Sequence, residues 1–121
     1  MRKHKAYPIP LFIIAITMSL CVTTIVSGCS KPDFVDAAGE NGRFKDFQGK
    51  WLVINYWAEW CEPCREEIPE FNRFARNHKD SAEVFAVSYD ALSAEQLAAQ
   101  AERMNIEYRV LTGDPAALLG F

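Results

Sequence analysis

The sequence has few residues of the kinds that build metal centres and disulfide frameworks. Its 121 residues include four cysteines and two histidines, of which only Cys61, Cys64 and His78 lie beyond residue 29. A structural zinc site needs a second ligand pair at matching spacing, and a haem attachment site needs a histidine directly after C-x-x-C, where Arg65 stands. The sequence therefore disfavours both kinds of site and leaves Cys61 and Cys64 as a single pair.

The chain also lacks an excess of positive charge. Three of its 13 basic residues, Arg2, Lys3 and Lys5, lie at the N-terminus, which leaves ten basic against 16 acidic residues and a formal charge of −6 from residue 29 onward. Such a body is unsuited to nucleic acid and to electrostatic adhesion to an anionic membrane. It contains no internal repeat and no low-complexity tract, and residues 29–121 suffice for one small domain.

The first 28 residues do not read as part of a fold. Residues 1–5 are basic, residues 11–26 are largely apolar without a charge, and residues 26–29 (V-S-G-C) resemble a bacterial lipobox. We expect a lipoprotein signal peptide over 1–28, lipid on the thiol of Cys29, and a lipidated tether over 29–33. The alternative is an uncleaved transmembrane anchor, since the apolar stretch approaches the ~20 residues that span a bilayer. Both place the remainder in the bacterial cell envelope, facing the periplasm or the exterior.

The cysteine pair lies between a β-type run at 51–57 and a helical pattern over 62–78. A cysteine at the first turn of a helix faces unpaired N–H groups and the positive end of the helix dipole, which stabilise the reactive thiolate. Cys64, one turn on, can attack a mixed disulfide formed by Cys61. The pattern predicts a dithiol–disulfide exchange site, with a module that binds and delivers a soft metal such as Cu(I) or Zn²⁺ as the alternative.

Residues 51–64, which end in W-A-E-W-C-E-P-C, resemble the active-site segment of the thioredoxin superfamily. Asn55, Glu62-Pro63 and residues 65–69 (R-E-E-I-P) are similar to the TlpA/ResA-like branch of extracytoplasmic disulfide reductases. The resemblance implies an α/β, thioredoxin-like domain over 34–121, with central parallel strands and flanking helices. It implies no cofactor beyond the redox-active disulfide of Cys61 and Cys64.

The resemblance also assigns roles to the cysteines and to two polar residues near them. Cys61 is the exposed attacking thiol and Cys64 the buried resolving thiol. Asn55 stands where thioredoxin has a buried aspartate, and because an amide cannot titrate, the proton-moving role falls elsewhere or is lost. Glu67 is the acid implicated in the ResA-like branch, or alternatively a solvated first-turn acid favoured by the helix dipole.

Three more residues are predicted to support the active site. Trp60 is expected to cover one side of it. Pro63 costs nothing at a helix start and fixes the geometry between the two sulfurs. The charge of Glu62 opposes thiolate formation on the attacking cysteine.

The family resemblance further implies the partners. Substrates are oxidised extracytoplasmic proteins, apocytochrome c among them, and a membrane thiol electron donor of the DsbD/CcdA type returns the pair to its reduced state. The membrane itself is contacted through the lipid anchor.

Periodicity and turn residues predict the order of the elements. We expect an edge strand at 34–38, a turn at 40–43, a central strand at 51–57 buried on both faces, a helix over 62–78 that His78 ends, a strand at 83–88, a helix from Ser93 to 105 opened by a Ser93/Gln96 capping box, a strand at 108–111, and a helical turn after Asp114. The family then continues with a cis-proline loop and antiparallel strands. The sequence therefore predicts a C-terminally shortened member of low stability, and a nonfunctional remnant is a further alternative.

Overall fold

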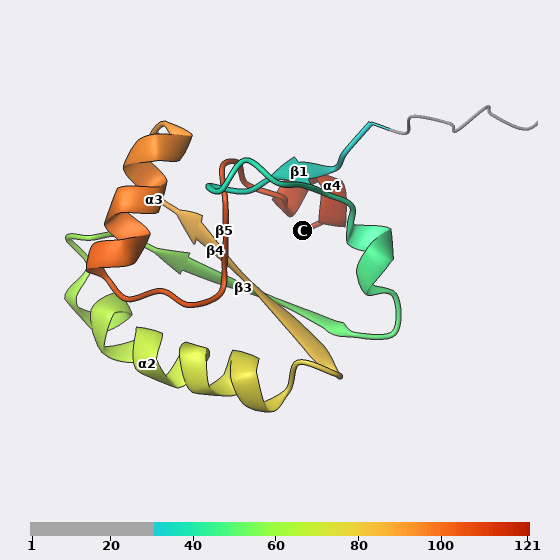
Figure 1. Ribbon diagram of the computed structural model, residues 1–121, viewed down its shortest axis with the longest axis horizontal. Helices are drawn as coiled ribbons and strands as arrows, with labels where there is room; N and C mark the ends of the chain where they lie inside the picture. The colour runs from blue at the N-terminus through green and yellow to red at the C-terminus, as the bar shows by residue number, and fades with distance from the viewer. Residues whose placement is uncertain (1–30) are drawn as a thin grey trace, which may run out of the picture. The chain divides into compact units, whose positions relative to one another are not determined.

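The computed structural model describes residues 31–121 (Figure 1). The predicted lipidation site and leader, Cys29 and residues 1–28, lie outside the described residues. The elements are the strands β1 (Phe34–Val35), β2 (Asn41–Gly42), β3 (Trp51–Trp57), β4 (Ala82–Ser88) and β5 (Arg109–Leu111), the helices α2 (Glu62–Asn77), α3 (Ala94–Arg103) and α4 (Ala116–Leu119), and the 3-10 helix η1 (Phe44–Phe47).

Three parallel strands in the order β3-β4-β5 form the central sheet. Trp51 to Trp57 pair in register with Ala82 to Ser88, and β5 pairs with the second half of β4. Each connection runs through a helix, as parallel neighbours require. β1 and β2 form a separate antiparallel hairpin, which meets the end of β5 through a bridge between Asp36 and Leu111. The predicted order of strands and helices from residue 51 onward is confirmed.

Side chains of the sheet alternate between two apolar clusters. Val84 and Ala86 of β4 belong to the cluster that α2 and α3 cover, while Phe85 and Val87 belong to the cluster that β1 and η1 cover. Figure 1 shows α2 and α3 on one side of the sheet and β1 and η1 on the other. Because side chains alternate along a strand, Asn55 of β3 points to the side of the two long helices.

The prediction that β3 is the central strand is wrong, although its side chains contribute to the apolar clusters on both faces of the sheet. β4 is the central strand and is buried through most of its length, whereas β3 lies at one edge of the sheet and begins with Trp51, which is 80% exposed. Within residues 31–121 no strand pairs with the outer side of β3. A continuous apolar run indicates a strand of a parallel sheet, but it does not say which strand has neighbours on both sides.

The N-terminal hairpin also differs from the prediction. The strand expected at 34–38 is shorter, because β1 ends at Val35, and residues 41–42, predicted as part of a turn, form β2 instead. The turn lies earlier, at Gly39, whose φ of +83° suits glycine. The Asp36 carboxylate accepts hydrogen bonds from the N–H groups of Ala38 and Glu40, so it holds the turn in a way that composition alone does not reveal.

The helix ends agree with the sequence signals. Ser93 and Gln96 form the predicted capping box at the start of α3. His78 ends α2, where its N–H donates to the Phe74 carbonyl and its ring lies 4.5 Å from the Phe74 ring. Within α2 the side chain of Phe74 is exposed, whereas the polar side chain of Asn72 is buried, with 3% of its surface exposed.

Candidate active site

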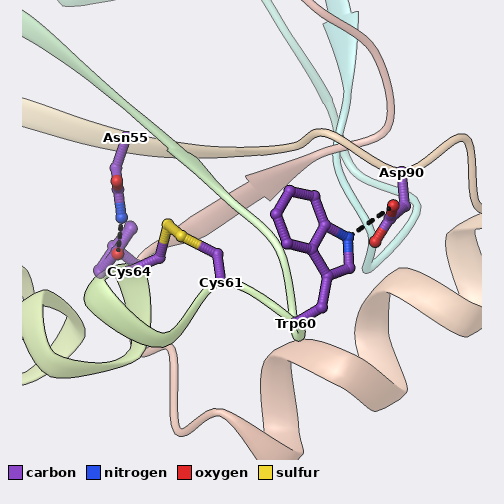
Figure 2. Close-up of a disulfide and its surroundings, with 6 residues drawn as sticks. Asn55, Trp60, Cys61, Cys64 and Asp90 are labelled. Atoms are coloured by element: carbon purple, nitrogen blue, oxygen red, sulfur yellow. Dashed lines mark hydrogen bonds between the residues drawn. A yellow bond between two sulfur atoms is a disulfide. The ribbon is translucent and has the colours of Figure 1, made fainter.

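The cysteine pair lies where the chain leaves β3 and enters α2. Cys61 is the N-cap residue of the helix, and its N–H donates to the Ala58 carbonyl at 3.1 Å, which closes a tight turn after the strand. Cys61 and Cys64 form a disulfide with sulfurs 2.00 Å apart (Figure 2). The predicted strand–cysteine–helix arrangement is therefore present.

The start of α2 provides an environment that favours a thiolate on Cys61. Its side chain makes no capping hydrogen bond, and the first helical bond runs from the Arg65 N–H to the Cys61 carbonyl at 3.2 Å. The other N–H groups of the first turn, and the positive end of the dipole of this 16-residue helix, lie at the N-terminus of α2, where Cys61 is located. Pro63 has no N–H to leave unpaired, and Glu62 is exposed, so its opposing charge is screened by solvent.

The two cysteines differ in what they contact. Both are half-buried, but Cys64 packs against the cluster that includes Trp57, Tyr108 and Leu97. A thiol held against the core reacts with the neighbouring cysteine more readily than with a large external disulfide. The packing thus suits the predicted roles, with Cys61 attacking and Cys64 resolving, and these roles stay predictions.

Two side-chain contacts hold the loop that precedes the cysteines. Glu59 accepts two hydrogen bonds from Arg103 of α3, at 2.9 and 3.0 Å. These bonds lower the pKa of Glu59 and raise that of Arg103. On the other side the Trp60 indole N–H donates to Asp90, the second residue after β4, at 3.1 Å (Figure 2). The loop is therefore fixed to two elements that follow it in the chain.

Trp60, which was predicted to cover one side of the active site, is exposed to solvent in the structure. It is 71% exposed, with its ring 6.4 Å from the Tyr89 ring and its indole directed to Asp90. Trp57, by contrast, is fully buried beneath the site. Trp60 therefore borders the disulfide as an exposed surface, and whether it covers a bound substrate stays a prediction.

Asn55 contacts a residue that the sequence did not single out. It is 6% exposed, and its side-chain amide donates to the hydroxyl of Tyr108 at 2.7 Å. Burial raises the pKa of Tyr108, the hydrogen bond from Asn55 acts in the opposite direction, and the negative charge of Glu67 raises the pKa again. The position of thioredoxin's buried acid is thus occupied by an amide–phenol pair that stays neutral at ordinary pH.

Glu67 is the third residue after Cys64 in α2, and its side chain is exposed. It lines a hollow of about 600 Å³ between β3 and α2. Val53, Phe71 and Phe74 form the apolar part of that hollow. The negative charge of the Glu67 carboxylate raises the pKa of the buried Tyr108. Its predicted part in proton movement stays a prediction.

Sequence reasoning missed the residues that hold the site from a distance. Arg103, Asp90 and Tyr108 lie 44, 30 and 53 residues from their partners Glu59, Trp60 and Asn55. Nothing in their local sequence marks them, because each is an ordinary residue at the end of a helix, in a loop or at a strand start.

Two features are absent from the described part of the chain. No helix within residues 31–121 is long and apolar enough to cross a membrane. In the same residues no three His, Cys, Asp or Glu side chains gather in a way that could hold a metal ion.

The fold and the site together define a thioredoxin-like domain with a redox-active C-x-x-C pair. The chain belongs to the AhpC/TSA family, whose model matches residues 27–118. The predicted thioredoxin-like α/β fold and the resemblance to the TlpA/ResA-like branch are confirmed by this match and by the relatives that follow.

Two curated relatives show how far the similarity extends. A thioredoxin-like protein of Bacillus subtilis, YneN, is 32% identical over 91 residues, which are 72% of this chain and 54% of the relative. The thiol-disulfide oxidoreductase ResA of Geobacillus kaustophilus is 33% identical over 94 residues, 74% of this chain and 52% of that protein. The chain therefore spans about half the length of these relatives.

Solved structures show the same fold. A structure from Chlorobium tepidum, described as a thiol:disulfide interchange protein DsbE, has a TM-score of 0.57 and 25% identity over 72% of this chain and 63% of its own. The thioredoxin domain of a thiol-disulfide oxidoreductase from Bacteroides vulgatus has a TM-score of 0.56 at 22% identity, covering 71% of this chain and 61% of its own.

Proposed function

We propose that this chain is a thiol–disulfide oxidoreductase of the bacterial cell envelope, working as a reductase and tethered to the membrane by lipid on Cys29. The observation that carries the proposal is the place of the Cys61–Cys64 disulfide. It lies at the N-terminus of α2, with Cys64 against the core. That setting supports a pair that cycles between dithiol and disulfide.

The proposed reaction moves two electrons from the pair to a substrate disulfide. The Cys61 thiolate attacks one sulfur of the substrate, which forms a mixed disulfide and releases the other substrate sulfur as a thiol after it takes up a proton. Cys64 loses its proton and attacks the Cys61 sulfur, which forms the Cys61–Cys64 bond and releases the second substrate thiol. The disulfide in the structure corresponds to this oxidised end state.

The substrates and the electron donor are part of the proposal. Relatives carry the names thiol-disulfide oxidoreductase ResA and thioredoxin-like protein, which supports protein disulfides as substrates. We include the cysteines of apocytochrome c before haem attachment among these substrates. A membrane thiol donor of the DsbD/CcdA type would return Cys61 and Cys64 to the dithiol state.

Trapping the mixed disulfide tests the proposal. Cys64→Ser in the full chain removes the resolving thiol, so substrates should remain bonded to Cys61 and appear as higher-mass adducts on non-reducing gels of cell envelopes. A thiol reductant should release them. The matched control is Cys61→Ser, which keeps one cysteine at the same site but removes the attacking one, and it should give few adducts or none.

The outcome is decided by the difference between the two single variants. Adducts that depend on Cys61 support the exchange reaction, and their identification by mass spectrometry names the substrates. If Cys64→Ser gives no adduct beyond those of Cys61→Ser, the reaction proposed here is wrong. The tether is tested separately, by metabolic labelling with palmitate that should be lost in Cys29→Ala.

A further inference from the structure

A buried tyrosine shares the apolar cluster against which the resolving cysteine packs. Tyr108 is 8% exposed and lies just before β5, and Cys64 packs against the same cluster from α2. The Asn55 amide is also directed into the surroundings of the disulfide, toward the side of Cys64 (Figure 2). Tyr108 and Cys64 therefore contribute to the same apolar cluster, Tyr108 from the segment before β5 and Cys64 from α2.

The hydrogen bond from Asn55 restricts what the Tyr108 hydroxyl can do. A phenol has one O–H donor and acceptor lone pairs on its oxygen. The Asn55 amide occupies one lone pair, at 2.7 Å, so the O–H must point away from Asn55. The hydroxyl is thereby held as a donor, and a buried donor is stable only with an acceptor.

Two side chains of α2 are candidate acceptors for the Tyr108 hydroxyl. From α2 come Cys64 and the Glu67 carboxylate, whose charge acts on the phenol. β3 contributes the neutral Asn55, and the α3 residues of the cluster are Leu97 and Ala101, which are apolar.

The charged neighbours of Tyr108 along the chain are turned elsewhere. Glu107 pairs with Arg76, and Arg109 pairs with Asp36. When the disulfide is reduced, the acceptor that newly appears on the core side is therefore the sulfur of Cys64.

We propose that the Tyr108 hydroxyl, oriented by Asn55, donates a hydrogen bond to the Cys64 thiolate of the reduced protein. This inference rests on the proposed function, in which Cys64 must lose its proton to resolve the mixed disulfide. The proton leaves Cys64 to water, and the hydroxyl stabilises the anion that remains without giving up its own proton. The donor stays protonated throughout, because burial and the nearby carboxylate favour the neutral phenol.

The proposal is tested by the midpoint of Cys64, which is the pH at which half of this residue is thiolate. All proteins are full chains in the Cys61→Ser background, reduced, and alkylated over a range of pH. Trypsin cleavage after Lys50 and Arg65 gives a peptide in which Cys64 is the single remaining cysteine, so mass spectrometry follows this residue alone. The alkylation rate against pH gives the midpoint without any substrate.

Tyr108→Phe removes only the hydroxyl and should raise the midpoint of Cys64 by about one pH unit, since a hydrogen bond to a charged group is worth ~1.5 kcal/mol and one unit is 1.36 kcal/mol. Below the midpoint this leaves about tenfold less thiolate. The matched control is Tyr56→Phe, whose hydroxyl donates to Asp114 at 2.8 Å on the other face of the sheet, and which should leave the midpoint where it is.

If the Cys64 midpoint in Tyr108→Phe equals or lies below the midpoint in Tyr56→Phe, the proposal is overturned. The Tyr108 hydroxyl is then assigned as a donor to the Glu67 carboxylate instead. If Tyr108→Phe does not unfold cooperatively, Asn55→Leu decides. That variant removes the amide that orients the hydroxyl, and the proposal requires a rise in the Cys64 midpoint there as well. Because no substrate is present, failure here leaves the trapping result untouched, and a failed trapping experiment leaves this titration valid.

Discussion

Replacing Asn72 should weaken the domain more than any exposed substitution in the same helix. The side chain is 3% exposed and bridges α2 to the segment before β5. Its amide donates to the Asn105 carbonyl at 2.7 Å, and its oxygen accepts from the Glu107 N–H at 2.9 Å. Asn72→Ala removes both bonds and releases the segment that leads into Tyr108.

The magnitude follows from these two bonds. Each is worth about 1 kcal/mol net, and because Asn105 and Glu107 are exposed, water can reach the groups left unpaired, so no large desolvation cost is added. The higher helix propensity of alanine offsets about 0.5 kcal/mol. We expect Asn72→Ala to lower the free energy of unfolding by about 1.5 kcal/mol, which for a domain of this size lowers Tm by about 6–12 °C.

The assay is thermal and urea unfolding of the oxidised protein, followed by circular dichroism, with the disulfide intact in every sample. Asn77→Ala is the matched control, because it makes the same chemical change at the exposed end of α2 and should alter stability by less than about 0.5 kcal/mol. Equal stability of the two variants would refute the reasoning, since it would mean that the buried bridge contributes nothing.

Two further predictions concern the hairpin and the loop before the cysteines. A methyl group at Gly42 would overlap the packed Phe34 ring, so Gly42→Ala should cost about 1–3 kcal/mol in urea unfolding, whereas Gly113→Ala, where a methyl meets open space, should cost much less; equal costs would contradict the overlap. Arg103 lowers the pKa of Glu59, so the contact contributes to stability above the ordinary glutamate pKa and is lost as pH falls through the lowered value. In Arg103→Met the Glu59 carboxyl should titrate near its ordinary value of about 4.3, as followed by NMR, and an unchanged midpoint would show that Arg103 is not the cause.

Local signals in the sequence were sufficient for much of the fold. The capping box at Ser93 and the helix end at His78 depend on residues within one turn, so the sequence contains both partners of each contact. The turn at Gly39 was misplaced because its stabilising group, the Asp36 carboxylate, reaches the backbone of two later residues from within a predicted strand. Sheet order was beyond the sequence, since apolar runs at β3 and β4 look alike and differ only in how many neighbours they have.

The sequence by itself determined the exchange chemistry that we propose for this protein. Two cysteines at C-x-x-C spacing, after an apolar strand and at the start of a helix, place a reactive sulfur at a positive helix end, and this depends only on neighbouring residues. The tertiary structure alone decided what surrounds that pair. Asn55 meets Tyr108 and Glu59 meets Arg103 across 53 and 44 residues of chain, because strand order and helix crossings, which no local pattern specifies, bring them together.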